Sequence, residues 1–370
     1  MTGIKPNPMN GPNKFKLGIF SANADGGLAL TTVPERWQAK WSDILSVAQL
    51  CDRSGFDFFL PIARWKGFGG SSNARHDCFE TFTFGAALGA ATERMAIFST
   101  VHAPFVHPVF AAKALTTCDH VSQGRAGLNI VCGWNEAEFA AFGKDKPEGP
   151  YDLGDEWYDI MLKVLEGEGP FDYAGKYYSV KGAEGGPKPV QQPRPVTLSA
   201  AFSPRGREFA ARTSDCIFTT FVEFEDAAVN MEDFHARAQK QSRDIGVYTA
   251  NHVVCRPTQE EAEAYYERFA VKEADHAAVD NHMKGKQKSS GSHDEAAYRQ
   301  HRKRFAGGAG TYPLVGTPQR IVDDMLKMSE IGFDGTGLTF VNYLHELPYF
   351  IDTVLPLMEE AGLREKFVSV

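Results

Sequence analysis

Short apolar runs alternate with amphipathic stretches along most of the chain, as in proteins where strands and helices follow one another. Eight runs rich in β-branched and aromatic residues predict strands, at 15–20, 56–63, 95–102, 126–133, 195–201, 215–222, 249–255 and 335–341. Helical patterns lie between them, at 40–53, 77–92, 108–121, 155–166, 204–213, 225–244, 258–275, 318–331 and 345–361. This alternation in one chain of 370 residues predicts an α/β fold, a (β/α)8 TIM barrel with insertions.

A doubly wound sheet is the alternative fold, because it shows the same alternation of strands and helices. Its first turn from strand to helix usually carries the Gly-rich fingerprint G-x-G-x-x-G. After the first run of this chain the sequence is SANADGG, which does not match that fingerprint. The barrel is therefore the prediction.

Two segments depart from the repeating pattern. Residues 1–14 are rich in Pro, Asn and Gly and predict a loose N-terminal tail, so that 15–370 forms a single barrel. Residues 276–314 are polar, Gly/Ser-rich and basic, and they are longer than an ordinary barrel connection. An irregular insertion of this length predicts a lid over the site, with a disordered excursion as the alternative.

Composition and charge narrow the possible partners. The formal net charge is −8 and the pI about 5.8, which argues against nucleic acid or an anionic membrane as a partner, since both require clustered basic residues. Membrane-spanning helices are not expected, because no apolar run approaches twenty residues. The six cysteines form no CxxC pair and no secretion signal precedes them, so we expect free thiols and a cytoplasmic location.

The ends of the predicted strands carry the candidate chemistry, because barrel enzymes place their sites there. Thr100 and Asn129 each lie among apolar neighbours near a strand end. An amide buried without a hydrogen-bond partner costs about 1–3 kcal/mol, so Asn129 must bond to something. Either residue could instead be satisfied by nearby backbone, and this alternative stays open.

Ser203 and Pro204 lie where a helix begins directly after a strand. Free backbone N–H groups and a hydroxyl at such a helix start can bind phosphate, although most Ser-Pro pairs are only caps. Neither a catalytic triad nor a metal-ligand set stands out: His102 and His107 flank APFV without a third ligand, and Cys132 fits a buried structural thiol. Chemistry without catalytic side chains indicates a cofactor.

Four segments carry a resemblance to a known family: SGFDFFLPIARWKGFGG, FETFTFGAALGAATERMAIFSTV, HPVFAAKALTTCDHVSQGRAGLNIVCGWNEAEF and LVGTPQRIVDDM. They resemble the bacterial-luciferase-like monooxygenases, and within these the branch of pyrimidine monooxygenase and dimethylsulfone monooxygenase. The likeness covers roughly residues 15–363. It implies a TIM barrel that binds reduced FMN supplied by a separate NAD(P)H:flavin reductase, and a homo-oligomer, either a dimer or a tetramer.

The resemblance also implies which residues hold the cofactor. Ala63 and Arg64 are expected against the flavin, and Asn129 and Glu138 against the flavin or its ribityl chain. The phosphate end is expected at Trp157, Tyr158 and Ser203. Relatives have an arginine where Trp157 stands, so one charge is missing, and Arg205 or Arg207 is a candidate replacement.

The same resemblance places an oxygen pocket beside the flavin. Its expected residues, which we take as the catalytic set, are Leu60, Ile62, Thr100, Asn129 and Trp134. The apolar members suit the entry of O2, while the Thr100 hydroxyl and the Asn129 amide are expected to donate hydrogen bonds to the peroxide that forms. Gly133 lets the backbone turn, and Trp134 is expected to exclude water.

The expected activity is therefore an FMNH2- and O2-dependent monooxygenase that cleaves a small organic substrate through a flavin peroxide. RWKGFGG at 64–70 is closer to pyrimidine monooxygenase and favours a heterocyclic amide or another N-heterocycle. A sulfone or a halogenated aromatic compound is the alternative substrate. Two rival functions are an F420-dependent reductase of the same fold and a flavin-binding protein without turnover.

Overall fold

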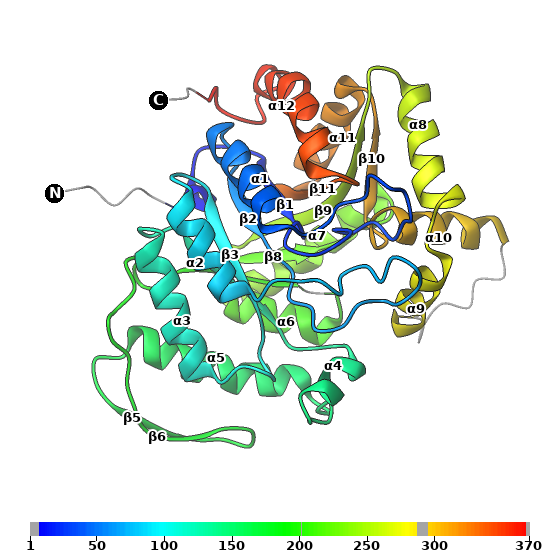
Figure 1. Cartoon of the computed structure of the whole chain (residues 1–370). Coiled ribbons are helices and arrows are strands. Elements are labelled where there is room, and N and C mark those ends of the chain that lie inside the picture. The colour runs from blue at the N-terminus through cyan, green and yellow to red at the C-terminus, as the bar shows by residue number, and fades with distance from the viewer. Residues whose placement is uncertain (1–6, 201, 287–294, 368–370) are drawn as a thin grey trace.

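Eight parallel strands of the described chain close into a barrel (Figure 1). The computed structural model describes residues 7–200, 202–286 and 295–367. Around the barrel the order is β1, β2, β3, β4, β7, β8, β9 and β11, and β11 pairs with β1 to close the ring. These strands span Lys16–Phe20, Phe58–Leu60, Ala96–His102, Ala126–Val131, Val196–Ala200, Cys216–Thr219, Gly246–Cys255 and Gly335–Thr339. The predicted (β/α)8 TIM barrel is confirmed.

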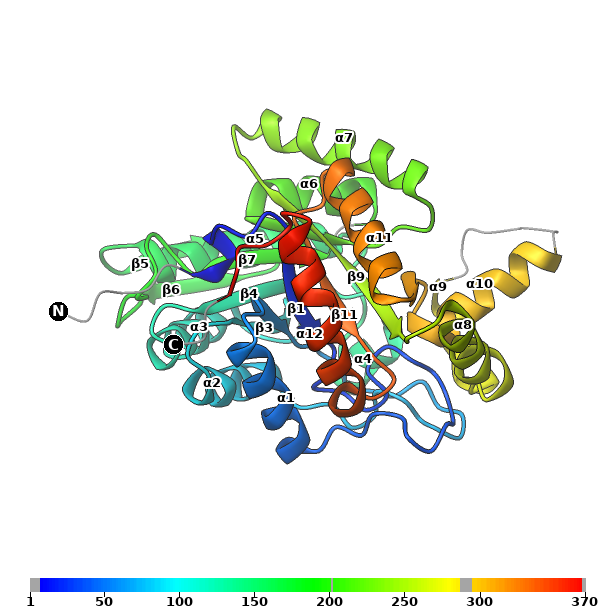
Figure 2. The ribbon, with the colours of Figure 1, turned by 90° about the horizontal axis from the view of Figure 1, so that it is seen from above.

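Helices surround the strands, as the view in Figure 2 shows. In the described residues the main ones are α1 (Trp41–Arg53), α2 (Thr81–Ala91), α3 (Pro108–Val121), α5 (Pro150–Glu166), α6 (Pro204–Thr213), α7 (Phe224–Lys240), α11 (Pro318–Ile331) and α12 (Tyr343–Glu360). Additional elements are η1 (Pro8–Asn10), α4 (Glu136–Ala141), β5 (Phe171–Ala174), β6 (Ser179–Ala183), α8 (Gln259–Glu267), η2 (Arg268–Lys272), α9 (His276–Lys286), α10 (Glu295–Gly308) and β10 (Tyr312–Gly316).

Three of the described α-helices begin with a capping side chain followed by proline. His107 caps α3, Ser203 caps α6 and Thr317 caps α11, and proline occupies the next position each time. Proline fits there because the first helical N–H has no partner inside the helix. Since α3 follows β3 and α6 follows β7, both helix N-termini lie at the end of the barrel where a site is expected.

Large side chains fill the barrel interior. The buried residues of this cluster are Met9, Leu28, Phe58, Leu60, Ala96, Phe98, Val196, Leu198, Cys216, Phe218, Tyr248 and Ala250. Two glycines make room for them, because a Cβ on Gly18 would lie 2.2 Å from the Phe58 ring and one on Gly127 would lie 2.5 Å from Phe98. Apolar side chains therefore fill the barrel interior, and a site is expected at the carboxyl ends of the strands.

The N-terminal segment is packed from Asn7 onward. Met9 is 6% exposed and belongs to the barrel-interior cluster, and the Asn7 amide donates to Gln191 at 2.9 Å. Residues 1–6 of the expected loose tail lie outside the described residues. An apolar methionine in a polar stretch is the reason the packing extends beyond the predicted boundary at residue 15.

The segment 276–314, expected as an irregular lid, contains α9, α10 and the start of β10, and its residues 287–294 lie outside the described chain. Its basic residues find partners: Arg302 pairs with Asp280, and Lys303 with Glu267 at 2.6 Å. On the apolar side, Met283 and Ala306 are buried in one cluster. Pairing and burial explain the helices, while the role as a lid stays a prediction.

Two strand pairings were not predicted. β10 pairs in parallel with the second half of β9, which at ten residues is the longest strand described. The segment 167–194, where no strand was predicted, holds the antiparallel hairpin β5–β6, which has no buried residue in either strand. An exposed hairpin lacks the apolar run by which a strand is recognised.

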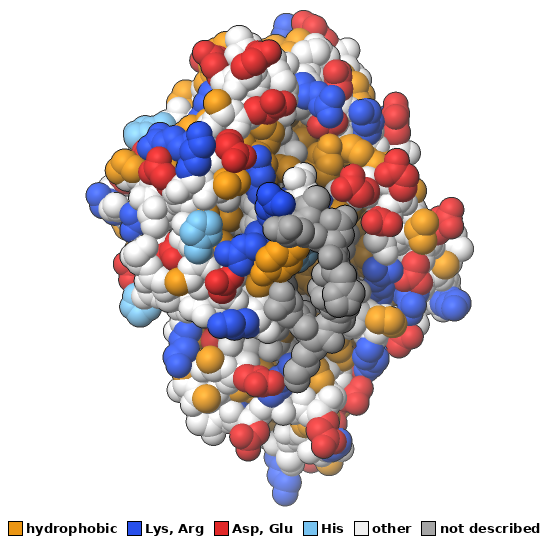
Figure 3. All heavy atoms as spheres, turned by 90° about the vertical axis from the view of Figure 1, so that its right-hand side faces the viewer, with side chains coloured by type: hydrophobic (Ala, Val, Ile, Leu, Met, Phe, Trp, Pro, Cys, Tyr) orange, Lys and Arg blue, Asp and Glu red, His pale blue; other side chains and the backbone are white. Residues whose placement is uncertain are grey.

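Charged side chains of both signs are mixed on the face around α8 and α10 (Figure 3). Arg268, for example, pairs there with Glu35 and Glu273. Within the described part of the chain, none of the helices combines the length and apolar character needed to cross a bilayer.

Candidate active site

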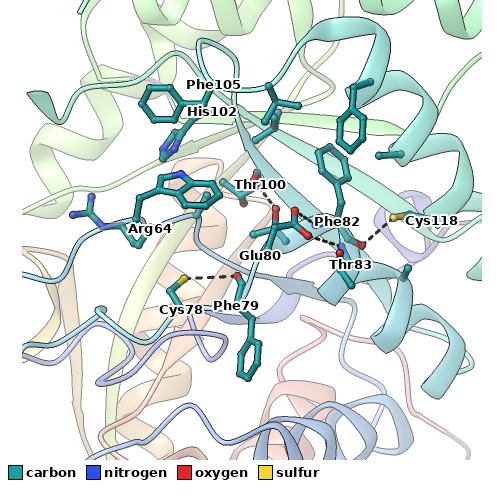
Figure 4. A pocket seen from close by; sticks show the side chains of 18 of the residues that line it. Arg64, Cys78, Phe79, Glu80, Phe82, Thr83, Thr100, His102, Phe105 and Cys118 are labelled. Atoms are coloured by element: carbon teal, nitrogen blue, oxygen red, sulfur yellow. Dashed lines mark hydrogen bonds between the residues drawn. The ribbon is translucent and has the colours of Figure 1, made fainter. Parts of the chain in front are cut away.

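A cavity of about 650 Å³ lies at the carboxyl ends of β2 and β3 and extends between α2 and α3 (Figure 4). Its walls are mostly apolar and come from the segments 63–65, 78–86, 100–106 and 110–118. Three residues expected at the site, Ala63, Arg64 and Thr100, line this cavity. The volume suits a small organic ligand or part of a larger one.

Asn129 and Thr100 face each other across neighbouring strands. They are paired in the register of β3 and β4, and the Asn129 amide nitrogen donates to the Thr100 hydroxyl at 3.1 Å. The Thr100 hydroxyl in turn donates its hydrogen to the Pro61 carbonyl at 2.5 Å. A hydroxyl that has donated its hydrogen can only accept from Asn129, so the orientation of the amide is fixed.

This arrangement leaves the Asn129 carbonyl oxygen without a partner among the described residues, although the side chain is only 7% exposed. Leaving a buried acceptor unpaired costs about 1–3 kcal/mol. One expectation is corrected here: the Thr100 hydroxyl cannot donate to a ligand while its hydrogen goes to Pro61. Asn129 therefore offers mainly an acceptor, which fits an N–H group of a bound ring.

Arg64 and Glu138 form a buried ion pair beside the cavity. Arg64 Nε lies 3.3 Å from Glu138 Oε1, and the exposed fractions of the two side chains are 6% and 2%. Burial raises the pKa of Glu138, and the Arg64 charge opposes that rise. Glu138 also accepts from the backbone N–H of Trp65 at 3.1 Å. Helix α4, which carries Glu138, is thereby tied to the loop after β2.

Aromatic rings enclose the Arg64 guanidinium. It lies 4.7 Å from the ring centroid of Phe68 and 5.2 Å from that of Trp134. Trp134 is 38% exposed and follows Gly133, whose φ of +86° only glycine adopts easily. A Cβ on Gly133 would also lie 2.9 Å from Phe139. The tight turn predicted at the end of β4 is confirmed.

Leu60 and Ile62, at and just after the end of β2, do not line the cavity. Leu60 is fully buried in the barrel interior. Asn23 holds the backbone of Ile62 from both sides: Ile62 N donates to Asn23 Oδ1 at 2.9 Å, and Asn23 Nδ2 donates to Ile62 O at 2.7 Å. The sequence reading missed Asn23, which fixes the loop carrying Ala63 and Arg64.

At the expected phosphate end, Ser203 accepts from Gly206 N at 3.1 Å as the N-cap of α6. The tyrosine next to it is Tyr151, because a Cβ on Gly206 would lie 2.5 Å from the Tyr151 hydroxyl. Interaction with Ser203 lowers the pKa of Tyr151, although burial raises it more. Helix α5 begins at Pro150, five residues before the predicted start, so Tyr151 is helical and reaches Ser203.

Trp157 and Tyr158 do not join this group, and their expected role at the phosphate stays a prediction without a supporting contact. Trp157 is fully buried and its indole N–H donates to Val106 O at 2.7 Å. Tyr158 is 3% exposed, and its pKa is raised by burial while Arg194 and Arg243 lower it. Both side chains lie on α5, six and seven residues beyond Tyr151.

Neither arginine proposed to replace the missing phosphate charge is free in the structure. Arg205 is paired with Asp152 and Asp155, and Arg207 with Asp233 at 2.9 Å. The start of α6 therefore offers backbone N–H groups and two hydroxyls instead of an additional cation. Across residues 7–200, 202–286 and 295–367, no three His, Cys, Asp or Glu side chains gather as metal ligands do.

Comparison with known proteins identifies the family. The chain is 29% identical to the FMNH2-dependent dimethylsulfone monooxygenase of Pseudomonas putida, over 95% of this chain and 97% of that protein. It is 28% identical to the pyrimidine monooxygenase of Enterobacter sp. (strain 638), over 93% and 96%. The structure of a long-chain alkane monooxygenase superposes with a TM-score of 0.85 at 24% identity, covering 96% and 93% of the two chains. Residues 15–335 match the model of the luciferase-like monooxygenases, so the chain belongs to that family.

Proposed function

We propose that this protein is a monooxygenase that binds reduced FMN and uses O2 to oxidise a small organic substrate. The observation that carries the proposal is the unpartnered Asn129 oxygen, held by Thr100 at the carboxyl end of the barrel. Its relatives support the proposal, because they are named FMNH2-dependent.

The residues fit FMN along the row of strand ends. Ala63 and Arg64 offer a wall for the ring system, and Asn129 an acceptor for one of its N–H groups. Ser203 and Tyr151 offer hydroxyls to the phosphate, together with the backbone N–H groups that begin α6. Bound reduced FMN would supply the electrons that activate O2.

The side chains around this position contribute placement and exclusion of water. Thr100 orients Asn129, because its hydroxyl is bonded to both Pro61 O and the Asn129 amide. Leu60 and Ile62 supply apolar backing at the end of β2. Trp134 lies over Arg64 and is placed to keep water from the reacting centre.

The substrate we favour is a heterocyclic amide or another N-heterocycle. RWKGFGG at 64–70 supports this choice, as does the likeness to a pyrimidine monooxygenase. A sulfone is the second candidate, because the dimethylsulfone monooxygenase of Pseudomonas putida is similar to the same degree. A separate NAD(P)H:flavin reductase would supply the reduced FMN, and a homo-oligomer stays a prediction.

The test is turnover with labelled oxygen. Purified protein would be incubated in air with FMN, NADH and a generic flavin reductase, against uracil, other N-heterocycles, dimethylsulfone and halogenated aromatics. Mass spectrometry after 18O2 exposure should find one labelled product, which names the substrate class. Firm binding of F420 with no binding of FMN would contradict the proposal.

A further inference from the structure

Most polar groups that line the cavity already have partners. Glu80 accepts from the backbone N–H groups of Phe82 and Thr83 at 2.7 and 2.8 Å, as the N-cap of α2. The Thr81 hydroxyl donates to Thr100 O at 2.6 Å. Lys113 donates to the Gly186 carbonyl. These bonds tie the three side chains to the walls of the cavity.

His102 differs from these three residues. It is the last residue of β3 and follows Thr100 by two positions, so both side chains point to the same face of the strand. Its side chain lines the cavity beside Phe105, with the ring centroids 5.4 Å apart (Figure 4). The residue is 5% exposed, and its Nδ1 has no hydrogen-bond partner in the described part of the chain.

The imidazole is neutral at physiological pH. Burial, with a smaller effect of the Arg64 charge, lowers the pKa of His102 to about 4. A neutral imidazole has one nitrogen that donates and one that accepts. It can therefore bond to either a carbonyl or an N–H group of a ligand, which suits an amide whose two groups lie side by side.

The charges around the cavity argue against an ionised ligand. A carboxylate inside the cavity would need a buried unpaired cation, but Arg64 is paired with Glu138 and Lys113 is an exposed residue that donates to Gly186 O. A cationic ligand would need a free carboxylate, but Glu80 is held by two backbone N–H groups. The cavity walls are otherwise mostly apolar, so desolvating an ion there would be unfavourable.

We propose that His102 binds the substrate of this enzyme, by a hydrogen bond between its ring nitrogen and an uncharged amide or imide group. This inference rests on the proposed monooxygenase function and specifies which residue selects its substrate. His102 is not among the residues to which the proposed function assigns FMN. Its replacement should therefore change substrate binding and leave FMN binding unchanged.

Calorimetric titration of the FMN-loaded protein tests this selection. The probes are the uncharged uracil, 2-pyridone and succinimide, with orotate as the ionised counterpart of uracil and dimethylsulfone as an uncharged compound without an amide. We expect at least one amide or imide to bind and orotate to bind more weakly than uracil. His102→Phe keeps a ring but no hydrogen-bonding nitrogen, and should weaken that binding at least tenfold.

His102→Gln retains a donor and an acceptor and should keep part of the affinity, which a purely structural role would not predict. His345→Gln, at an exposed histidine on α12, is the matched control and should bind as the wild type does. FMN affinity, measured separately by quenching of flavin fluorescence, should agree within about twofold among all four proteins.

Three results would overturn the assignment of His102: equal amide binding by wild type and His102→Phe, tighter binding of orotate than of uracil, or binding of dimethylsulfone alone. Absence of binding for all three amides to the wild type would also overturn it. Failure of the wild type to bind FMN is a different result, because it contradicts the proposed function from which the inference starts.

Discussion

Asn129 lowers the stability of the folded protein without ligand, because its buried carbonyl oxygen has no partner among the described residues. Asn251, on β9, offers a matched comparison. It is also buried, but its amide nitrogen donates to Tyr312 O at 2.8 Å and its oxygen accepts from Thr336 at 2.6 Å. One asparagine is satisfied by the fold and the other has an unused acceptor.

Substitution by leucine should separate these two roles. Asn129→Leu loses one hydrogen bond and also removes an unpaired acceptor, so the free energy of unfolding should change by only about 1 kcal/mol. Asn251→Leu loses two hydrogen bonds and leaves both partner groups buried without a bond. The free energy of unfolding should therefore fall by roughly 2–4 kcal/mol. Urea unfolding measures both values.

FMN binding should show the opposite order. Asn129→Leu should weaken FMN at least tenfold, a loss of about 1.4 kcal/mol or more. Folded Asn251→Leu should bind FMN as the wild type does. If both variants keep wild-type FMN affinity, Asn129 is not a cofactor ligand.

At the scale of elements, the start of α5 decides which tyrosine lies at the proposed phosphate site. Tyr151 lies in its first turn beside Ser203, whereas Tyr158 is two turns further on and buried in the core. Tyr151→Phe should weaken FMN by roughly ten- to a hundredfold, because a hydrogen bond to a charged group is worth about 1.5–3 kcal/mol. Fluorescence titration measures this change.

Two controls make that test specific. Riboflavin lacks the phosphate, so its affinity should be the same for Tyr151→Phe and the wild type. Tyr158→Phe should leave FMN affinity unchanged. Equal weakening of FMN and riboflavin by Tyr151→Phe would place this tyrosine elsewhere on the cofactor.

Asp275 links two further elements, the loop 64–76 and helix α9. Its carboxylate accepts from Ser72 N at 2.6 Å and from Ala278 N at 3.1 Å. Burial works to raise the pKa of Asp275, but these N–H groups outweigh it and lower the pKa overall. Asp275→Ala removes the hydrogen bond from Ser72 N and should therefore make the loop 64–76, which carries Arg64, more mobile.

Limited proteolysis checks this coupling. Asp275→Ala should be cleaved faster within 64–76 than the wild type, and its free energy of unfolding should fall by about 1–3 kcal/mol. Asp280→Ala removes a neighbouring carboxylate that pairs with Arg302 and is the control. Unchanged cleavage in Asp275→Ala would show that other contacts hold the loop.

The elements were predictable where apolar runs mark them and not where they are short or polar. The run 56–63 marks β2, although only Phe58–Leu60 forms the strand. The hairpin β5–β6 is exposed and gave no such signal. The start of α5 lies among Gly and Pro, so the helix was expected from 155, although it begins at Pro150. The expected phosphate contact at Tyr158 came from the family resemblance, and nothing in the sequence indicated that Tyr151 lies beside Ser203.

At the scale of the whole molecule, the site depends on how the residues of neighbouring strands pair, and a single sequence does not reveal this register. Asn129 and Thr100 were expected near each other because both lie near strand ends. Only the pairing of β3 with β4 shows that they are bonded, and only the Pro61 carbonyl shows that Thr100 must accept. Asn23 was missed for the same reason, since it acts on Ile62 across 39 positions of the chain.

The same interior makes the molecule sensitive to acid. His252 is fully enclosed, and burial, with a smaller effect of Arg256, lowers its pKa from 6.5 to about 3. Between these values the unfolded state binds the proton and the folded state does not. Stability from His252 is therefore complete above pH 6.5 and is lost as the pH falls, by about 1.4 kcal/mol per unit.

Urea unfolding at pH 7.5 and 5.5 measures this loss. His102 acts in the same direction, while burial raises the pKa of Asp57 and Glu346 and gives these carboxyls the opposite effect. The difference between wild type and His252→Gln isolates one group: the variant should lose about 1–2 kcal/mol less between the two pH values. His345→Gln, exposed on α12, should behave as the wild type. An equal loss in wild type and His252→Gln would mean that His252 is protonated in the folded barrel, which its burial opposes.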